Sequence, residues 1–119
     1  MQRKLLGQQA ESLAKKHLQN KSYHFVTQNF RTKFGEIDLI FLSPDKSTIV
    51  FIEVKARHQV NLGLPEEAVT PEKLKTITKV SEYFLQTHPD FPQLARIDVI
   101  AIELDQSPLK IRHIKNASV

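Results

Sequence analysis

The stretch "GEIDLIFLSPDKSTIVFIEVKAR", Gly35–Arg57, decides the fold of this chain. Two apolar runs, Ile37–Leu42 and Ile49–Val54, flank a polar segment in which Pro44 and Asp45 favour a turn. The pattern predicts an antiparallel hairpin. Charged side chains nevertheless lie within both strands, namely Glu36, Asp38, Glu53 and Lys55.

The hairpin register brings two of these acids together. If residues 44–47 form the turn, residues whose numbers sum to 91 face each other. The expected pairs on one face are Leu42 with Ile49, Ile40 with Phe51, Asp38 with Glu53, and Glu36 with Lys55. The expected pairs on the other face are Phe41 with Val50, Leu39 with Ile52, and Ile37 with Val54. Directly opposed residues have Cβ atoms about 4.5–5.5 Å apart, so Asp38 and Glu53 could share one ligand.

Two carboxylates at this distance repel each other unless a proton or a cation lies between them. Oxygen ligands without cysteine favour a hard cation, Mg²⁺ or Mn²⁺. Lys55 lies about 6.6 Å along the strand from Glu53, within reach of charge that develops on a phosphoryl group. The alternative is a salt-bridge network in which Lys55 and Arg57 pair with Glu36, Asp38 and Glu53.

The rest of the chain predicts an α/β domain with a mixed sheet flanked by helices. An apolar stripe predicts a first helix, and Thr70 with Pro71 predicts the start of a second. The expected elements are a helix over Leu5–Leu18, strands over Tyr23–Phe30 and the hairpin, a helix from Pro71 to about Gln86, and strands over Leu94–Leu104 and Leu109–Lys115. A helix between the third and fourth strands predicts that these two strands are parallel.

Composition sets broad limits on function. The 119 residues suffice for one domain, 1–119, and the net charge of +4 permits a polyanionic partner. No apolar run approaches about 20 residues, and the charged N-terminal segment lacks the apolar core of a secretory signal, so we expect no membrane partner. The absence of cysteine favours a cytoplasmic protein.

An acid on the second strand followed by Glu-x-Lys on the third resembles the PD-(D/E)XK nuclease superfamily, which includes restriction endonucleases and Holliday junction resolvases. The chain is similar over nearly its whole length to the YraN family of small bacterial proteins. The segments that carry this similarity are "GQQAESLAKKHL", "QNFRTKFGEIDLI", "FIEVKAR", "GLPEEAV" and "RIDVI".

The resemblance implies a restriction-endonuclease-like α-β-β-β-α-β core and a divalent metal held by Asp38 and Glu53, with Lys55 as the catalytic lysine. It also implies a catalytic glutamate on the first helix, matched by Glu11; a solvated helix glutamate is the equal alternative. Ile37 departs from the superfamily pattern, which has proline there. Resolvase-like relatives act as dimers, so the resemblance allows a homodimer.

Four basic residues form the expected nucleic-acid-binding set, namely Arg31, Lys33, Arg57 and Lys73. Each could contact a phosphate, and the alternative for each is a solvated cation. Lys73 also matches a family position.

Three further residues have specific expectations. Asp98 is interpreted as a structural partner for a cation, with support of the site as the alternative. Asn29 could hydrogen-bond to the loop before Gly35 or be a polar strand-end residue. Gly35 is expected to serve an unusual backbone conformation or a close approach.

The sequence therefore predicts a metal-dependent nuclease that hydrolyses phosphodiester bonds in DNA, with branched or otherwise structured DNA as a candidate substrate. The alternative is a nucleic-acid-binding module on a nuclease fold with little or no catalysis. A purely structural domain would require the acids to form the salt-bridge network.

Overall fold

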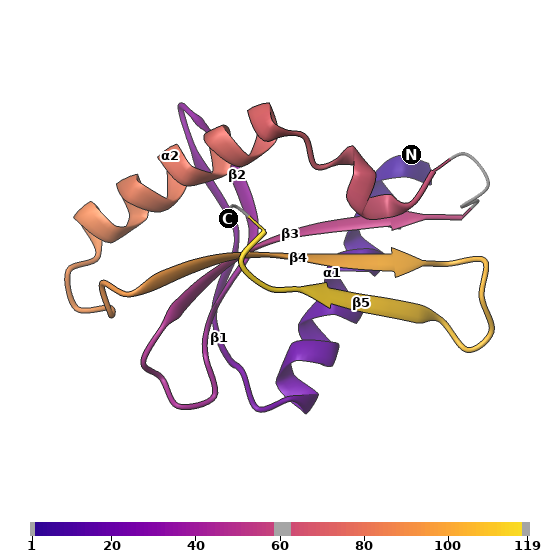
Figure 1. The fold of residues 1–119 in the computed structure, drawn as a ribbon, viewed down its shortest axis with the longest axis horizontal. Coiled ribbons are helices and arrows are strands. Elements are labelled where there is room, and N and C mark those ends of the chain that lie inside the picture. The colour runs from indigo at the N-terminus through magenta and orange to yellow at the C-terminus, as the bar shows by residue number, and fades with distance from the viewer. Residues whose placement is uncertain (1, 59–62, 118–119) are drawn as a thin grey trace.

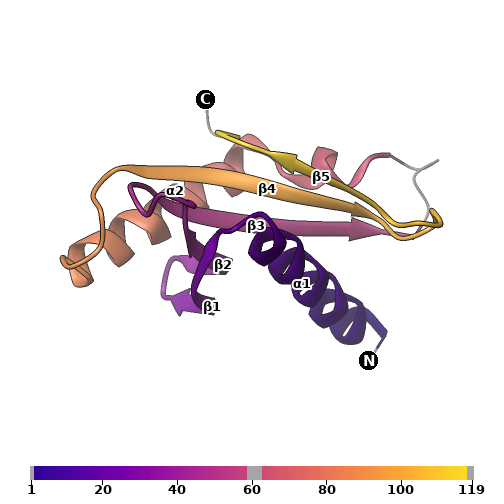
Figure 2. The same ribbon diagram turned by 90° about the horizontal axis from the view of Figure 1, so that it is seen from below.

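The computed structural model describes residues 2–58 and 63–117, with side chains from Gly7 onward. A five-stranded mixed sheet in the order β1-β2-β3-β4-β5 carries a helix on each face (Figures 1 and 2). The elements are α1 (Gln2–Asn20), β1 (His24–Thr32), β2 (Gly35–Leu42), β3 (Ile49–Arg57), the 3₁₀ helix η2 (Pro65–Ala68), α2 (Pro71–Thr87), β4 (Ala95–Glu103) and β5 (Lys110–Ile114). The predicted order of helices and strands is confirmed, and η2 was not predicted.

The sheet has one parallel pair, β3 with β4, and every other neighbouring pair is antiparallel. This confirms the parallel arrangement expected for the strands joined through α2. The predicted hairpin register is also confirmed where β2 and β3 pair. The paired residues are Leu39 with Ile52, Ile40 with Phe51, Phe41 with Val50, and Leu42 with Ile49.

The helices bury two apolar layers, one against each face of the sheet. Ala10, Ala14 and Leu18 of α1 pack against β2, β3 and β4, and the two alanines let this helix lie close to the strands. On the opposite face, α2 buries a layer that includes Ile77, Val80 and Phe84. Burial of one such large apolar side chain contributes about 1.5–3 kcal/mol relative to leaving it exposed. The helices therefore fix the sheet from both sides.

The start of α2 follows from its sequence. Thr70 has extended backbone angles, and its Oγ1 accepts a hydrogen bond of 3.2 Å from the backbone N–H of Lys73. Pro71 occupies the first turn, where its missing N–H costs nothing. This confirms the predicted N-cap, and it fixes the backbone position of Lys73.

The β2 strand is irregular at Asp38. Its pairing with β3 does not continue past Leu39, so the expected direct pairs of Asp38 with Glu53 and of Glu36 with Lys55 are not part of the ladder. On the other side, Asn29 and Asp38 are also missing from the ladder with β1, which has a separate register shift between Phe25 and Thr27. Asn29 has a φ of 52°, a left-handed conformation that asparagine tolerates better than most residues.

This irregularity changes which face Ile37 occupies. Ile37 and Ile40 both belong to the layer beneath α2, although they are three positions apart, whereas Val54 belongs to the layer beneath α1. The expectation that Ile37 lies beside Val54 is therefore wrong. Regular alternation, on which that expectation depended, is interrupted between Ile37 and Ile40.

Candidate active site

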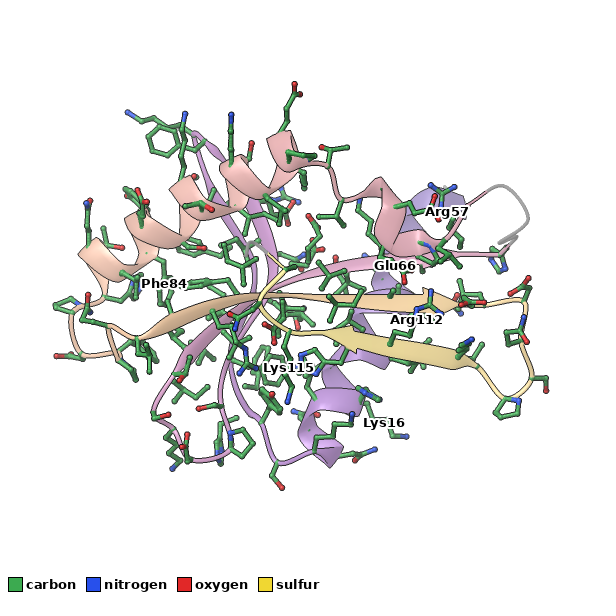
Figure 3. All side chains as sticks on the ribbon, viewed as in Figure 1. Lys16, Arg57, Glu66, Phe84, Arg112 and Lys115 are labelled. Atoms are coloured by element: carbon green, nitrogen blue, oxygen red, sulfur yellow. The ribbon has the colours of Figure 1, made fainter. Side chains whose placement is uncertain are left out.

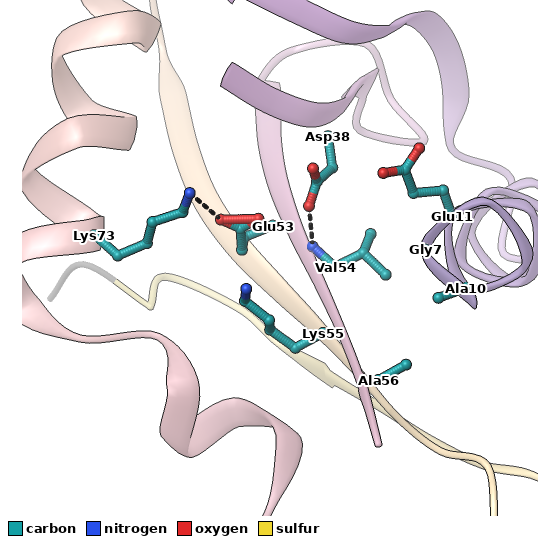
Figure 4. A pocket seen from close by; sticks show the side chains of 9 residues that line it. All are labelled: Gly7, Ala10, Glu11, Asp38, Glu53, Val54, Lys55, Ala56 and Lys73. Carbon is teal, nitrogen blue, oxygen red and sulfur yellow. Dashed lines mark hydrogen bonds and ion pairs between the residues drawn. The ribbon is translucent and has the colours of Figure 1, made fainter. Parts of the chain in front are cut away.

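A cleft of about 470 Å³ opens where β2 separates from β3, between the first half of α1 and the first turn of α2 (Figure 4). Asp38, Glu53, Lys55 and Lys73 supply its charged walls, together with Glu11 from α1. The remaining lining residues are small or apolar, namely Gly7, Ala10, Val54 and Ala56. The cleft thus brings together all four residues predicted as catalytic and one of the four predicted to bind nucleic acid.

Asp38 lies in the gap that the end of the β2–β3 ladder creates. Its Oδ2 accepts a hydrogen bond of 2.8 Å from the backbone N–H of Val54. A side chain here takes the place of the strand carbonyl that would otherwise satisfy this buried donor. The same carboxyl group faces the cleft beside Glu53 (Figure 4).

The surroundings of Asp38 favour its neutral form. Burial raises the pKa of Asp38 to about 8, with a further rise from the adjacent carboxyl of Glu53 and a smaller one from Glu36. The hydrogen bond from Val54 acts in the opposite direction, because it favours the charged form. An ionised Asp38 would therefore place a second negative charge beside Glu53, which a proton or a cation would relieve.

Glu53 comes from the buried middle of β3, and its side chain is only 5% exposed. Its Oε2 is buried and accepts no hydrogen bond from the described residues, although the ammonium of Lys73 lies 3.4 Å away. The contact is close enough for charge attraction but does not have hydrogen-bond geometry. Oε2 of Glu53 therefore has a nearby positive charge but no hydrogen-bond donor among the described residues.

Glu11 reaches the cleft from α1, the placement that the resemblance implied. Its Oε1 accepts a hydrogen bond of 3.0 Å from Nδ2 of Asn29. Burial raises the pKa of Glu11, and the charges of Asp38 and Glu36 raise it further, while the bond from Asn29 lowers it. Asn29 thus orients a cleft carboxyl group rather than the loop before Gly35.

Lys55 projects into the cleft on the Glu53 side (Figure 4). Among the described residues, neither Lys55 nor Arg57 forms an ion pair with the acids of the hairpin. Glu36 pairs instead with Arg31, at 3.4 Å, and lies outside the cleft lining. The alternative network, built on Lys55 and Arg57, is therefore not the arrangement that these side chains adopt.

The other three residues predicted to bind nucleic acid are not part of the cleft lining. Arg31 belongs to β1 and Lys33 to the turn that follows it, where the Lys33 ammonium lies 5.3 Å from the centre of the Phe34 ring. Arg57 ends β3 (Figure 3). Of the four residues predicted to bind nucleic acid, only Lys73 lines the cleft. These residues are available to a long ligand that leaves the cleft, and their role stays a prediction.

Asp98 has the structural role expected of it. Arg96 donates two hydrogen bonds of 2.9 Å to its carboxylate, and His113 lies 2.7 Å from Oδ2. The backbone N–H of Asn116 donates a further bond of 3.1 Å. Asp98 is completely buried, and these contacts fasten the end of the described chain to β4.

Sequence analysis missed two further features around the cleft. Arg112 on β5 donates hydrogen bonds of 2.8 and 2.6 Å to the two carboxylate oxygens of Glu66, and it also pairs with Glu103. This fastens η2, which precedes α2 and Lys73, to the far strands of the sheet (Figure 3). The other feature is the role of Asn29, for which the only signal was a residue that tolerates positive φ.

Comparison with known proteins gives the family. The sequence profile of the uncharacterised protein family UPF0102 matches residues 10–102. A UPF0102 protein of Syntrophomonas wolfei is 40% identical over 112 residues, which cover 94% of this chain and 96% of the relative. One from Syntrophus aciditrophicus is 41% identical, covering 93% and 86% of the two chains. A third, from Caldanaerobacter subterraneus, is 39% identical, covering 97% and 95%. The chain therefore belongs to the UPF0102 family.

Proposed function

We propose that this protein is a metal-dependent nuclease of the PD-(D/E)XK type that hydrolyses phosphodiester bonds in DNA. One observation carries the proposal: Oε2 of Glu53 is buried in the cleft without a hydrogen bond, beside Asp38. A buried carboxylate oxygen without a donor costs free energy, and a bound ion that this oxygen coordinates is one arrangement that recovers this cost.

A divalent cation fits this donor set. Asp38 and Glu53 would hold Mg²⁺ or Mn²⁺ through oxygen atoms, which hard cations prefer. Within residues 2–58 and 63–117, no group of three or more His, Cys, Asp or Glu side chains could hold a metal, so water and phosphate oxygens would complete the coordination. A bound cation would supply Lewis acidity toward the phosphoryl oxygen and lower the pKa of a nearby water.

The other cleft residues have distinct roles in the proposal. Lys55, which has no ion-pair partner among the described side chains, would stabilise negative charge on the phosphoryl group in the transition state. Glu11, oriented by Asn29, would hold and position the attacking water. Arg31, Lys33 and Arg57 would contact phosphates on either side of the scissile one.

The setting of this reaction follows from sequence arguments. The lack of cysteine favours the cytoplasm, and the resolvase-like resemblance favours branched DNA and a homodimer. Sedimentation of the free protein would decide between monomer and dimer. No helix in the described residues is long and apolar enough to cross a membrane.

A nucleic-acid-binding module with little or no catalysis is the second candidate. The observation that favours it is the ion pair of Lys73 with Glu53, since an internal ammonium then neutralises the carboxylate without any metal. In that case the cationic residues would bind DNA, and the acids would only hold the hairpin and α2 together.

Calorimetric titration with Mg²⁺ and Mn²⁺ tests the metal site. Wild type should bind one cation per cleft, and Asp38→Asn should lose this binding. Glu36→Gln is the matched control, because this neighbouring carboxyl lies on the same strand outside the cleft lining. Absence of binding by wild type, or unchanged binding by Asp38→Asn, would overturn the metal assignment.

Single-turnover cleavage of linear, flapped and four-way-junction DNA then separates the two candidate functions. We expect wild type to cut at least one of these substrates in Mn²⁺. Wild-type protein that binds these substrates but cuts none, at any metal concentration, would decide for the binding module.

A further inference from the structure

Lys73 occupies a position that a role in phosphate binding alone does not explain. Its backbone is fixed by the N-cap of α2, while its side chain extends across the cleft to Glu53 (Figure 4). The Lys73 side chain is 39% exposed and that of Glu53 is 5% exposed, so Lys73 is much the more open to solvent. Lys73 is thus the less confined partner of this pair.

The ion pair of Lys73 with Glu53 is electrostatically favourable but includes no hydrogen bond. An ammonium carries three N–H donors, yet none is directed at Oε2 with hydrogen-bond geometry, and the separation is 3.4 Å. Lys73 therefore compensates the charge of Glu53 without satisfying its oxygen. A ligand that bonds directly to this oxygen would have an advantage over the lysine.

A divalent cation would compete with Lys73 for the same oxygen. It carries twice the charge, and Mg²⁺ binds carboxylate oxygens at about 2.0–2.1 Å, much closer than the ammonium lies. Once it is bound, the ammonium would face a like charge at short range. Its side chain could then turn toward the open mouth of the cleft without any change in the backbone.

We propose that Lys73 is an internal counter-ion that a divalent cation displaces from Glu53, so that metal binding releases this ammonium to contact a phosphate of the nucleic acid. This inference rests on the proposed metal-dependent function and adds a regulatory step to it. Metal and nucleic acid would then strengthen each other's binding, because coupling between two ligands is reciprocal.

The first test follows the Lys73 ammonium directly in the wild-type protein. Its ¹⁵N side-chain resonance, assigned with Lys73→Met, should shift during titration with Mg²⁺ and should not shift in Asp38→Asn. Metal binding shown by calorimetry together with an unmoved Lys73 resonance would overturn this inference and leave the metal site intact. Wild type that binds no metal would overturn both.

The second test measures metal affinity. Removal of the competing ammonium in Lys73→Met should tighten Mg²⁺ binding by about 5–150-fold, the usual range for coupled sites. Lys75→Met is the matched control, because Lys75 lies on the same helix but lines a different pocket. Unchanged or weaker binding by Lys73→Met, or equal tightening by Lys75→Met, would overturn the inference.

The third test measures the released charge on DNA. With Ca²⁺ in place of Mg²⁺ to limit cleavage, the log–log salt slope of DNA binding should steepen on metal addition. The steepening should be greater in wild type than in Lys73→Met by about 0.9, the value for one duplex phosphate contact. The same metal-induced change in both proteins would show that Lys73 does not move to a phosphate.

Discussion

The surroundings of Asp38 act on the protonation of its carboxyl group in opposite directions. The backbone N–H of Val54 favours the charged carboxylate, whereas burial and the neighbouring Glu53 favour the neutral acid. Burial and repulsion together are the stronger influence, since the pKa of Asp38 is raised to about 8. A group in this state takes up a proton on folding at neutral pH.

The metal-free protein should therefore lose stability between about pH 4 and pH 8. An unfolded aspartate has a pKa of about 3.9, so in this window the folded state binds more protons than the unfolded state. The stabilisation is complete below the unfolded pKa and is lost as the pH rises through the folded value, by at most about 1.4 kcal/mol per pH unit. Urea unfolding at a series of pH values measures this slope.

Asp38→Asn should flatten that slope and should make the metal-free protein more stable than wild type at pH 8. Asp105→Asn, which changes an exposed carboxylate in the β4–β5 turn, serves as the control and should leave the slope unchanged. Equal slopes in wild type and Asp38→Asn would show that Asp38 does not hold a proton in the folded protein.

Lys55 should matter for the transition state more than for stability. Because its ammonium forms no ion pair among the described side chains, Lys55→Met removes no structural charge contact. Loss of one well-placed charge from a transition state typically costs about 10²–10³ in rate. We expect Lys55→Met to lower single-turnover cleavage by about this factor, with little change in DNA affinity or melting temperature. A large drop in melting temperature with intact cleavage would instead assign Lys55 a structural role.

At the scale of elements, the β1–β2 turn is held close to α2 by Gly35. This residue has a φ of 150°, and a Cβ added to it would lie 2.6 Å from Cγ2 of Thr76. Both expectations for Gly35, an unusual conformation and a close approach, are confirmed. Glycine here lets β2 begin directly beneath α2.

Gly35→Ala should lower the free energy of unfolding by at least about 1 kcal/mol, because alanine is strained at this φ and its Cβ collides with Thr76. Gly7→Ala is the matched control: outside its own stretch of α1, none of the described residues has an atom within 4 Å of its added Cβ. That control should raise stability by about 0.8–1.0 kcal/mol through helix propensity. Equal effects of the two substitutions, measured by thermal unfolding, would contradict the close approach.

The elements were predictable from the sequence, whereas the break at Asp38 was not. Periodicity and turn residues gave the strands, the parallel pair and the hairpin register, because these depend on local patterns. The interruption depends on the left-handed conformation of Asn29 and on β2 leaving β3, which are tertiary effects. The contact of Lys73 with Glu53 joins residues twenty positions apart on separate elements, so spacing alone could not show it.

At the scale of the whole molecule, cationic side chains near the cleft predict salt-dependent binding of DNA. Arg57 lies at the end of β3 nearer the cleft, whereas Lys46 lies in the turn that precedes the same strand. If Arg57 contacts a phosphate, Arg57→Gln should flatten the log–log salt slope by about 0.9. Lys46→Gln, the control, should leave the slope unchanged in fluorescence anisotropy titrations. A salt-independent affinity would indicate a partner other than nucleic acid.

The short ladder between β2 and β3 divides the sheet into two units. Only four residue pairs join β2 to β3, whereas nine join β3 to β4. Asp38 belongs to the β1–β2 unit and Glu53 to the unit of β3, β4 and β5. A cation held by both carboxylates would thus link β2 to β3, the neighbouring strands with the fewest paired residues. When the cation binds, amide hydrogen exchange should become slower between β2 and β3, at the Val54 N–H above all, with little change between β3 and β4.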